Sequence, residues 1–480
     1  MTKRKIVLVR PFIREYVNSQ SSESFESNIG LVPPLNIVCL SGAVREAGHE
    51  VLIYDCERSD STEAGYQKFL KEHNPDVIGI SIMTPNFHGA HHSAKLARKA
   101  VPNAKIICGG THLTIFPKET LEYSEFDYAF SGEGEGPLVQ FLDNLDSLNE
   151  AEIPGFVWRK GDEIIANSDE AMNENLDVLP LPAYDLLDLD FYQMPNSDKR
   201  LISLYLSRGC PYKCGFCYRN PQLLQVRFKS VDRALEEIGL LVEKYGIKSI
   251  NFVDETISIK KKWFLEFCEK LAAKNWDLKW QSPTRVTSID EEIVKAAKKA
   301  GCHTFRFGLE SGSPRILEKI DKHINLEATR RAVKLCRQYG IKTVGYFIVG
   351  YLDETPETIQ ETIRFAKALK LSYAAFFPAT PMPNTALLYE SEARGLVPKD
   401  YWRNFVLGKT LEPLPFVYPN AGDWAAKAYR SFYFSPKYVL RQMKEWDFYK
   451  KLPNNIRVAW DFLTMKYHRQ QISITSLRHV

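Results

Sequence analysis

The stretch Arg208-Gly209-Cys210-Pro211-Tyr212-Lys213-Cys214-Gly215-Phe216-Cys217 places three of the chain's nine cysteines within eight residues. Thiolates are soft ligands, and three of them in one loop can converge on a single metal centre. A structural zinc site would need a fourth ligand nearby, and the next histidine downstream is His303. A four-iron cluster suits three ligands better, because one iron then stays open for a further molecule. We therefore interpret Cys210, Cys214 and Cys217 as cluster ligands.

Around this loop, strand-like and helix-like segments alternate along the sequence. Apolar runs separated by helical patterns predict six strands, at residues 202–206, 249–253, 279–281, 304–308, 343–349 and 373–377. Consecutive strand–helix units of this kind predict a partial, parallel (β/α)6 barrel. We assign residues 201–395 to the barrel and residues 396–480 to an aromatic, mostly helical tail.

The spacing Cys-x3-Cys-x2-Cys, with an aromatic residue before the last cysteine and a β/α barrel around it, resembles the radical S-adenosylmethionine superfamily. The resemblance implies that Cys210, Cys214 and Cys217 hold a [4Fe–4S] cluster whose open iron chelates S-adenosylmethionine. It also implies reductive cleavage of that molecule to methionine and a 5′-deoxyadenosyl radical, with an electron donor such as a flavodoxin or ferredoxin. Cofactors carry this chemistry, so no acid–base pair or nucleophilic triad is expected.

Polar residues at the predicted strand ends match positions where this superfamily contacts S-adenosylmethionine. In the resemblance, Asp254 and Glu255 accept hydrogen bonds from the methionine ammonium, and Arg285 pairs with the carboxylate, for which a guanidinium is well suited. The segments 308–311 and 345–350 resemble those that contact ribose and adenine. The predicted contact residues are Phe216, Asp254, Glu255, Arg285, Glu310, Ser311 and Ile348.

Residues 1–150 predict a separate doubly wound, Rossmann-like domain. Short apolar runs at 6–9, 51–54, 77–82, 105–108 and 128–130 alternate with helical patterns, which indicates a parallel sheet with helices on both faces. Ligands in such sheets bind beyond the carboxyl ends of the strands. Glycines in the loops there let the backbone approach a bulky ligand, although ordinary nucleotide-binding folds share this feature.

The loops at 81–86, 109–112 and 132–136, with Leu31-Val32-Pro33-Pro34-Leu35, resemble a cobalamin-binding domain. The resemblance implies that the nucleotide tail of cobalamin lies between sheet and helices, with the corrin facing the barrel. Because the chain lacks the Asp-x-His-x-x-Gly pattern, we expect no protein histidine on cobalt, and His112 to contact the tail or the backbone. The predicted cobalamin-binding residues are Pro33, Pro34, Leu35, Ser81, Met83, Thr84, Gly109, Gly110, Thr111, His112, Gly132, Glu133, Gly134 and Glu135.

The remaining features narrow the class of protein. Residues 151–200 predict a connector that contains a hairpin of 155–158 and 163–166. A net charge of +4, with positive and negative residues interspersed, does not indicate binding to nucleic acid. The apolar runs are too short for a membrane span or a signal peptide, so we expect a cytoplasmic protein. We interpret His88, His91 and His92 as a polar helix face rather than a metal site.

The leading functional hypothesis is a cobalamin-dependent radical C-methyltransferase that acts on an unactivated carbon of a small-molecule or lipid-like substrate. A second is cyclisation or oxidative rearrangement of a tetrapyrrole or natural product without methyl transfer. Methylthiolation of RNA would need a second cluster, for which Cys39, Cys56 and Cys108 are a weak case. A non-catalytic cobalamin or redox sensor is a further alternative, although a sensor has no need of residues that bind S-adenosylmethionine.

Overall fold

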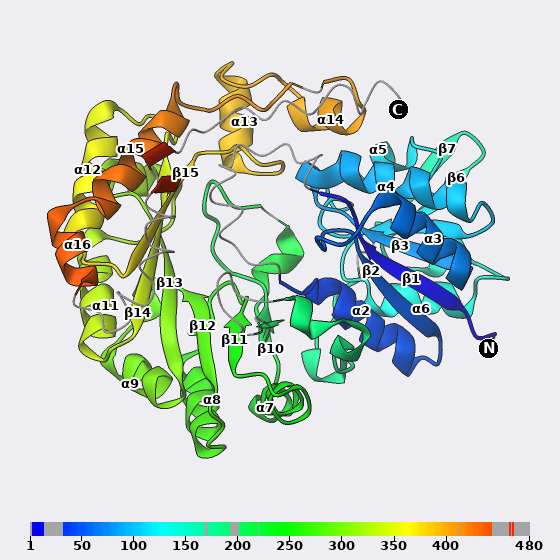
Figure 1. Ribbon diagram of the computed structural model, residues 1–480. Helices are drawn as coiled ribbons and strands as arrows, with labels where there is room; N and C mark the ends of the chain where they lie inside the picture. The colour runs from blue at the N-terminus through cyan, green and yellow to red at the C-terminus, as the bar shows by residue number, and fades with distance from the viewer. Residues whose placement is uncertain are drawn as a thin grey trace.

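The computed structural model describes residues 2–13, 32–168, 171–192, 200, 202–218, 220–410, 412–443, 460, 461, 463 and 464. Leu31 of the segment 31–35, and the tail residues 444–459 and 465–480, lie outside the described residues. Two layered α/β units stand next to each other, and helices near the C-terminus extend from one unit to the other (Figure 1).

The first unit is built on a seven-stranded sheet in the order β2-β1-β3-β4-β5-β6-β7. Strands β1 to β5 are parallel, and both faces are covered: α2 and α6 pack on one face, and α3, α4 and α5 on the other. The doubly wound fold is therefore confirmed. The strands are β1 (Lys5–Arg10), β2 (Glu50–Asp55), β3 (Val77–Ser81), β4 (Lys105–Gly109), β5 (Tyr128–Phe130), β6 (Phe156–Lys160) and β7 (Glu163–Ala166), and the helices are α2 (Leu35–Glu46), α3 (Glu63–His73), α4 (Phe87–Ala100), α5 (Pro117–Leu121) and α6 (Glu135–Asp143).

Strand order decides where this sheet binds a ligand. The order 2-1-3-4-5 reverses direction between β1 and β3, and a crevice forms at the carboxyl ends of the strands beside such a reversal. The predicted hairpin forms as β6 and β7, but it continues this sheet as an antiparallel edge. It does so because Phe156 packs edge-on against Phe130 in the core, with ring centroids 5.0 Å apart.

The second unit is a six-stranded parallel sheet in the order β15-β14-β13-β12-β11-β8, which confirms the partial (β/α)6 barrel. In β13, Phe305 and Phe307 are buried against the outer helices, whereas Arg306 and Gly308 alternate onto the opposite face. The strands are β8 (Ile202–Leu204), β11 (Ser249–Phe252), β12 (Lys279–Thr284), β13 (Cys302–Glu310), β14 (Lys342–Val349) and β15 (Tyr373–Pro378), and the helices are α7 (Val231–Gly239), α8 (Lys261–Ala273), α9 (Glu291–Lys299), α10 (Pro314–Ile320), α11 (Leu326–Gln338) and α12 (Pro356–Ala368).

Helix starts follow local sequence signals. Thr62, Asp290 and Asn325 each cap a helix by accepting a hydrogen bond from the backbone N–H three residues later. Each such cap stabilises its helix by about 1 kcal/mol. These polar residues sit where the helical patterns begin, so the helix starts are encoded locally.

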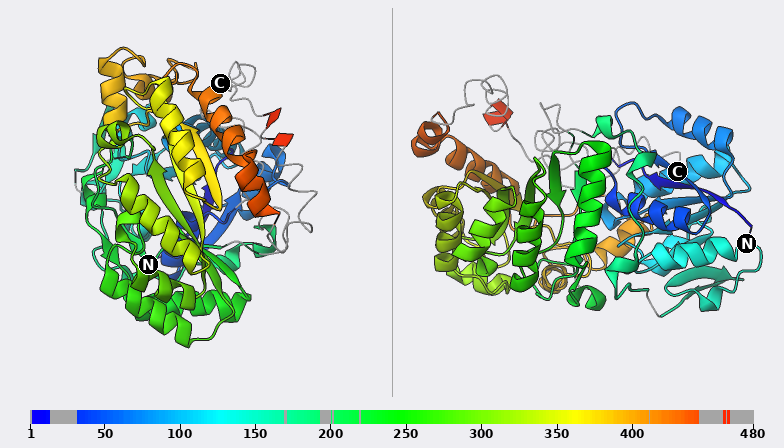
Figure 2. Two further views of the ribbon diagram at one scale, coloured as in Figure 1. Left: turned by 90° about the vertical axis from the view of Figure 1, so that its left-hand side faces the viewer. Right: turned by 90° about the horizontal axis from the view of Figure 1, so that it is seen from below.

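The tail divides between the two units. Helix α15 (Ala421–Tyr433) lies beside α12 and packs on β15 of the barrel (Figure 2). Helix α14 (Tyr401–Val406) instead packs into the core of the first unit, where Trp402 and Phe405 are buried. The remaining tail helix is α16 (Pro436–Gln442), and α13 (Ala386–Ala393) precedes the tail at the end of the barrel. Among the helices of the described residues, none is both long and apolar enough to cross a membrane.

Candidate active site

The three clustered cysteines lie on a loop that leaves a short antiparallel ribbon of β9 (Ser207–Arg208) and β10 (Arg227–Phe228). The N–H of Cys210 donates to the carbonyl of Leu223 at 2.7 Å. Gly209 has a φ of 97°, and a Cβ there would lie 2.3 Å from the carbonyl oxygen of Gln225. Only glycine fits this position, so the loop is held in a defined path where the first cysteine enters it.

The thiols lie close enough to influence one another. Burial and the charges of Cys214 and Cys210 raise the pKa of Cys217 to about 11, and burial also raises the pKa of Cys210. No three His, Cys, Asp or Glu side chains of the described residues are arranged to hold a metal ion. In a [4Fe–4S] cluster each thiolate binds a different iron, so the sulfurs need not meet at one ion, and the irons offset their mutual repulsion. The donor set therefore fits a cluster better than a single ion.

Asp254 follows β11 and fixes the start of the ribbon. Its Oδ1 accepts hydrogen bonds from the N–H of Leu206 at 3.0 Å and from the hydroxyl of Ser207 at 2.5 Å. Its Oδ2 is buried and has no hydrogen-bond partner among the described residues. Burial raises the pKa of Asp254 to about 6, and burial also raises the pKa of Glu255. A buried carboxylate oxygen without a donor suits an ammonium group, whose charge would favour the ionised form.

Arg285 lies against the cysteine loop. Its guanidinium carbon is 3.5 Å from the ring centroid of Tyr212, and one of its nitrogens donates to the carbonyl of Lys322. The side chain is buried, and its Nε has no partner within the described part of the chain. This cation therefore keeps a donor for an anionic group next to the predicted cluster.

Glu310 and Ser311, at the end of β13, have different surroundings. The Glu310 carboxylate forms a buried ion pair with Lys322, whose ammonium also lies 5.8 Å from the ring centroid of Phe216. The Ser311 hydroxyl is 3.0 Å from that of Thr362 in α12. Glu310 is thus placed beside the cysteine loop, whereas Ser311 is engaged with the helix layer.

Phe216 and Ile348 are brought together by packing. Both are partly buried against one apolar cluster, which includes Ile320 and Tyr351. Phe216 belongs to the cysteine loop and Ile348 to β14, so the loop and the fifth barrel strand meet at this cluster. The predicted contacts for S-adenosylmethionine therefore come from elements that border the loop.

Three residues of this region were missed by the sequence reasoning: Tyr212, Lys322 and Arg306. The Nη2 of Arg306 donates to the carbonyl of Phe252 at 2.9 Å, its Nε is buried without a partner among the described residues, and burial lowers the pKa of the side chain. Charged side chains are rarely buried unless they are paired. An arginine within a predicted buried strand was therefore an available signal for Arg306, whereas the neighbours of Lys322 follow only from the fold.

Two neighbouring cavities, which share lining residues such as Gly132 and Glu133, lie where the first unit meets the barrel. The tail cavity, of about 540 Å³, runs between the sheet and helices α2 and α6 and includes Leu8, Leu138 and Gly109. The mouth cavity, of about 500 Å³, faces the cysteine loop and includes Pro33, Met83 and Arg227. All the predicted cobalamin-binding residues except Thr84 and His112 line one of these two cavities.

The tail cavity leaves room for a planar group. Its walls are mainly apolar side chains of β1, β3, β4 and the two covering helices. A Cβ built on Gly109 would meet no atom closer than 3.9 Å, so a side chain there would project into the cavity. A mainly apolar cavity of this size beside the strand reversal fits the nucleotide base of cobalamin.

His112 lies outside both cavities. Its ring is fully buried, with Nδ1 3.0 Å from the hydroxyl of Thr84 and Nε2 2.9 Å from that of Thr120. Burial lowers the pKa of His112 to about 3. Both ring nitrogens are engaged, and no described histidine lines either cavity.

An ionic network joins the loop after β5 to the ribbon that carries the cysteines. Arg227 pairs with both carboxylate oxygens of Glu133, at 2.8 and 3.1 Å. Arg208 pairs with Glu133 at 3.2 Å and with Glu135 at 2.5 Å. Burial opposes ionisation, but the hydrogen bond from Arg227 and the charge of Arg208 bring the pKa of Glu133 below its usual value. The predicted cobalamin loop and the predicted cluster loop are thus directly linked.

The histidines of α4 do not converge. His88 contacts the carbonyl of Phe405 at 2.9 Å, and His91 and His92 each approach a different glutamate. His88 and His91 are buried, so their interpretation as a polar helix face was wrong. His88 instead connects α4 to the tail helix α14.

Known proteins resemble this chain over most of its length. Residues 204–366 match the model of the radical SAM superfamily, and residues 29–142 match that of the B12 binding domain. A protein of Pyrococcus horikoshii described as an uncharacterized methyltransferase is 35% identical over 86% of this chain and 90% of its own length. The anaerobic magnesium-protoporphyrin IX monomethyl ester cyclase of Cereibacter sphaeroides is 29% identical over 84% of this chain and 67% of its own.

The fold is likewise shared with a solved structure. The cobalamin-dependent S-adenosylmethionine radical enzyme OxsB, with aqua-cobalamin and S-adenosylmethionine bound, superposes with a TM-score of 0.73. The match covers 95% of this chain and 71% of the other at 19% identity. Both units, and their arrangement next to each other, are therefore common to the two proteins.

Proposed function

The chain belongs to the cobalamin-dependent radical S-adenosylmethionine enzymes, and we propose that within this family it methylates an unactivated carbon of a small-molecule or lipid-like substrate. The cofactors are a [4Fe–4S] cluster, S-adenosylmethionine and cobalamin. The relative described as a methyltransferase, similar over 86% of the chain, supports methyl transfer.

One observation carries the proposal: residues of both units wall the same cavity. Tyr218, Leu223 and Arg227 from the barrel line the mouth cavity together with Met83 and Glu133 from the first unit. A reaction that uses two cofactors on one substrate requires the two binding sites to face each other across one enclosed space. This space is formed by the loops at the carboxyl ends of the strands of both sheets.

In this proposal, the protein's own residues bind S-adenosylmethionine, orient it and shield it from water. When bound, the cluster would supply the electron that cleaves one S-adenosylmethionine to methionine and a 5′-deoxyadenosyl radical, which would take a hydrogen atom from the substrate carbon, and cobalamin would supply to that carbon a methyl group that it receives from a second S-adenosylmethionine. Asp254 and Glu255 accept hydrogen bonds from the ammonium of S-adenosylmethionine, and Arg285 donates to its carboxylate. Tyr212, stacked on Arg285, orients that guanidinium and keeps water away from it. A flavodoxin or ferredoxin is the proposed electron donor.

Cyclisation without methyl transfer is the second candidate, and the similarity to the Cereibacter sphaeroides cyclase favours it. Both reactions consume S-adenosylmethionine, so formation of 5′-deoxyadenosine does not separate them. The fate of the methyl group separates the two reactions, because only methyl transfer adds this group to the product.

The test uses the reconstituted enzyme with reductant, S-adenosylmethionine labelled in its methyl group, and extracts of candidate substrates. We expect 5′-deoxyadenosine together with a product that carries the label. The Cys210→Ala, Cys214→Ala, Cys217→Ala triple variant should contain roughly four fewer irons per chain and form neither compound. Deoxyadenosine with an unlabelled, ring-closed product would establish the cyclase, and absence of deoxyadenosine would indicate a sensor.

A further inference from the structure

The amino ends of the barrel strands carry a row of exposed lysines. Strands β11 to β15 are parallel neighbours, so they all begin at the same edge of the sheet, opposite the edge from which the cysteine loop leaves. Neighbouring strands are about 4.8 Å apart, so five of them span roughly 20 Å of this edge. An exposed lysine stands at the start of each strand or within three residues before it, and we call these five the lysine row: Lys248, Lys279, Lys299, Lys342 and Lys370.

Positive charge predominates along the whole edge. None of the five lysines forms an ion pair with another residue of the described ranges. Cations in the last turn of a helix stabilise the helix dipole, but four of the five lysines lie outside the helices, so helix stability alone does not explain the row. Ten lysines and arginines, but only two acids, occur in the connections that lead into the five strands, which are residues 243–248, 274–279, 298–302, 337–342 and 367–372.

Helix α16 is fixed beside the β15 end of the lysine row. The hydroxyl of Tyr438 donates to the carbonyl of Ser372 at 3.2 Å, and the guanidinium of Arg441 donates to the carbonyl of Leu371. Both carbonyls belong to the connection that contains Lys370. The helix lies on the side of the barrel that faces away from the first unit (Figure 1), so the first unit does not cover it.

Apolar side chains are exposed next to this contact. Leu440 is 60% exposed and Met443 is 44% exposed, and their spacing of three residues places them on one face of the helix. Phe434, Val439 and Tyr373 are each exposed by 40% or 42%, and we call the five residues the apolar patch. Single exposed apolar side chains are common, but a group of five on adjoining elements indicates contact with another molecule.

A cationic row beside an apolar patch fits the surface of a bilayer that contains anionic lipids. Lysines attract anionic headgroups, and apolar side chains enter the boundary between headgroups and acyl chains. Nucleic acid would pair with the lysines but would leave Leu440 and Met443 in water. An electron donor has to approach the cysteine loop, at the other edge of the barrel. The rest of the tail has the same sign of charge, since residues 444–480 contain seven lysines and arginines and three acids.

We propose that the lysine row and the apolar patch together dock the enzyme onto membranes that contain anionic lipids. The docking surface lies at the amino ends of the barrel strands, whereas the cofactor cavities lie at the carboxyl ends. Docking therefore leaves the active site accessible to substrate and electron donor. The inference does not depend on whether the enzyme methylates or cyclises its substrate.

The test measures partition of the cluster- and cobalamin-loaded enzyme onto vesicles by anaerobic flotation. One set of vesicles is phosphatidylcholine, and the other contains about one-quarter phosphatidylglycerol, which is anionic. Partition onto the anionic vesicles should be at least about tenfold stronger. It should weaken between about 0.1 M and 1 M NaCl, because the Debye length falls from about 10 Å to about 3 Å. Equal partition onto the two sets would overturn the proposal.

Matched pairs of lysines locate the surface. Lys279→Gln combined with Lys342→Gln removes two charges of the lysine row and should weaken partition onto anionic vesicles about 25-fold, or roughly fivefold for each lysine. Lys71→Gln combined with Lys99→Gln removes two exposed charges from the first unit and should leave partition unchanged. An equal loss in the two double variants would mean that only the net charge matters, which contradicts the proposal.

Leu440→Gln tests the apolar patch, because glutamine keeps a high helix propensity but removes apolar surface. Partition onto anionic vesicles should fall about fivefold. Leu396→Gln is the control, since Leu396 is also 40% exposed but follows α13, outside the apolar patch. If Leu440→Gln partitioned as the wild type does, the apolar patch would not enter the bilayer and the proposal would be wrong.

A short RNA duplex provides the comparison with nucleic acid. We expect no binding of the duplex in fluorescence anisotropy at about 0.15 M salt, where a purely electrostatic contact is weak. Suppose instead that the enzyme bound the duplex, lost this binding in the Lys279→Gln, Lys342→Gln variant and did not partition onto anionic vesicles. The lysine row would then be a surface for nucleic acid, and the membrane proposal would be overturned.

Discussion

At the scale of single residues, Gly109 offers a direct test of the tail cavity. The Cβ of a Val at this position would meet no protein atom closer than 3.9 Å, and its methyl groups would occupy space that borders the tail cavity. We expect Gly109→Val to weaken cobalamin retention at least tenfold and to leave the thermal unfolding of the apoprotein almost unchanged. Absorbance of bound cobalamin after gel filtration measures the effect.

Gly136 provides the control for this substitution. It is exposed on α6, lines neither cavity, and a Cβ built on it meets nothing within 4 Å. Gly136→Val should therefore retain cobalamin as the wild type does. Full retention by Gly109→Val would show that the tail of cobalamin lies elsewhere.

The raised pKa of Asp254 predicts that the thermal stability of the protein depends on pH. Its pKa is about 6 in the folded protein against a reference value of 3.8, so the folded state binds the proton more tightly than the unfolded state. The stability contributed by the protonated form is present below pH 4 and is lost as pH rises through 6. Asp254→Asn cannot ionise, so the Tm of the apoprotein relative to wild type should rise between pH 5 and pH 8, by about 2 °C or more.

The same substitution should weaken binding of S-adenosylmethionine about tenfold at pH 8, because a charge-assisted hydrogen bond to its ammonium is replaced by a neutral one. Calorimetric titration measures this. Asp162→Asn, on the exposed turn of the β6–β7 hairpin, should alter neither quantity. A Tm difference that does not vary with pH would mean that burial does not raise the pKa of Asp254.

At the scale of elements, the ionic network holds the loop after β5 against the cysteine ribbon. A double-mutant cycle of Glu133→Gln and Arg227→Met, followed by urea unfolding, should give a coupling free energy of about 2–4 kcal/mol, because removal of one partner leaves a buried charge. The exposed pair Lys68–Glu72, with side chains 76% and 58% exposed, should give about 0.3–0.5 kcal/mol. Equal coupling in the two pairs would show that the network does not join the loops.

Most elements could be predicted from the sequence because their signals are local. Apolar runs such as Ile6–Val9 predicted the strands. The caps Thr62 and Asp290 are local signals as well, but the prediction did not use them. The ribbon β9–β10 escaped prediction because each of its strands has two residues, too few for a periodic pattern. The attachment of the hairpin to the sheet was also missed, since it depends on the contact of Phe156 with Phe130, distant in sequence.

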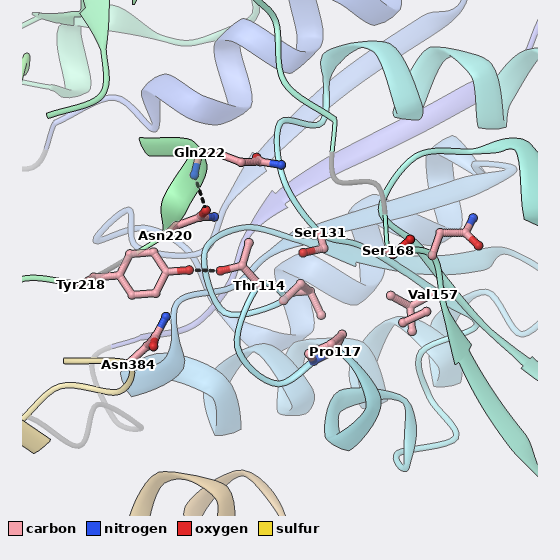
Figure 3. Close-up of a pocket in the computed structure, with 12 residues that line it drawn as sticks. Thr114, Pro117, Ser131, Val157, Ser168, Tyr218, Asn220, Gln222 and Asn384 are labelled. Atoms are coloured by element: carbon pink, nitrogen blue, oxygen red, sulfur yellow. Dashed lines mark hydrogen bonds between the residues drawn. The ribbon is translucent and has the colours of Figure 1, made fainter. Parts of the chain in front are cut away.

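The candidate site likewise contains residues that could be predicted from the sequence and residues that could not. The cysteines and the glycine-rich loops are contiguous motifs, and the structure places most of the residues predicted from them on the cysteine loop or along the two cavities. Lys322 could not be predicted, because its role follows from its approach to Glu310 across the barrel rim. The cavity that Thr114 and Asn384 line (Figure 3) could not be predicted either, since these two residues are more than 250 positions apart in sequence.

At the scale of the whole molecule, α14 links the two units. Trp402 is buried in the core of the first unit, and its Nε1 donates to the carbonyl of Pro381 at 2.8 Å. Trp402→Ala should destabilise the protein by about 3–5 kcal/mol and separate its thermal unfolding into two transitions, because the contact that makes the units unfold together is lost. Differential scanning calorimetry measures both effects.

Trp276→Ala is the matched comparison. Trp276 is only partly buried, beside α7 and α8 on the barrel, and it contributes nothing to the core of the first unit. This variant should unfold in a single transition with a smaller loss of stability. A single transition for Trp402→Ala as well would show that the units are coupled by other contacts.

Helix α14 lies late in the sequence but packs into the first unit, and this order has a consequence for biosynthesis. The core that contains β1 and α4 is completed by residues 388–414, which leave the ribosome long after β7 ends at Ala166. At about 5–20 residues per second, roughly 12–50 s separate the two events. During that interval the nascent first unit exposes the apolar surface that Trp402 and Phe405 later cover, and exposed apolar surface of this kind promotes aggregation of unfinished chains.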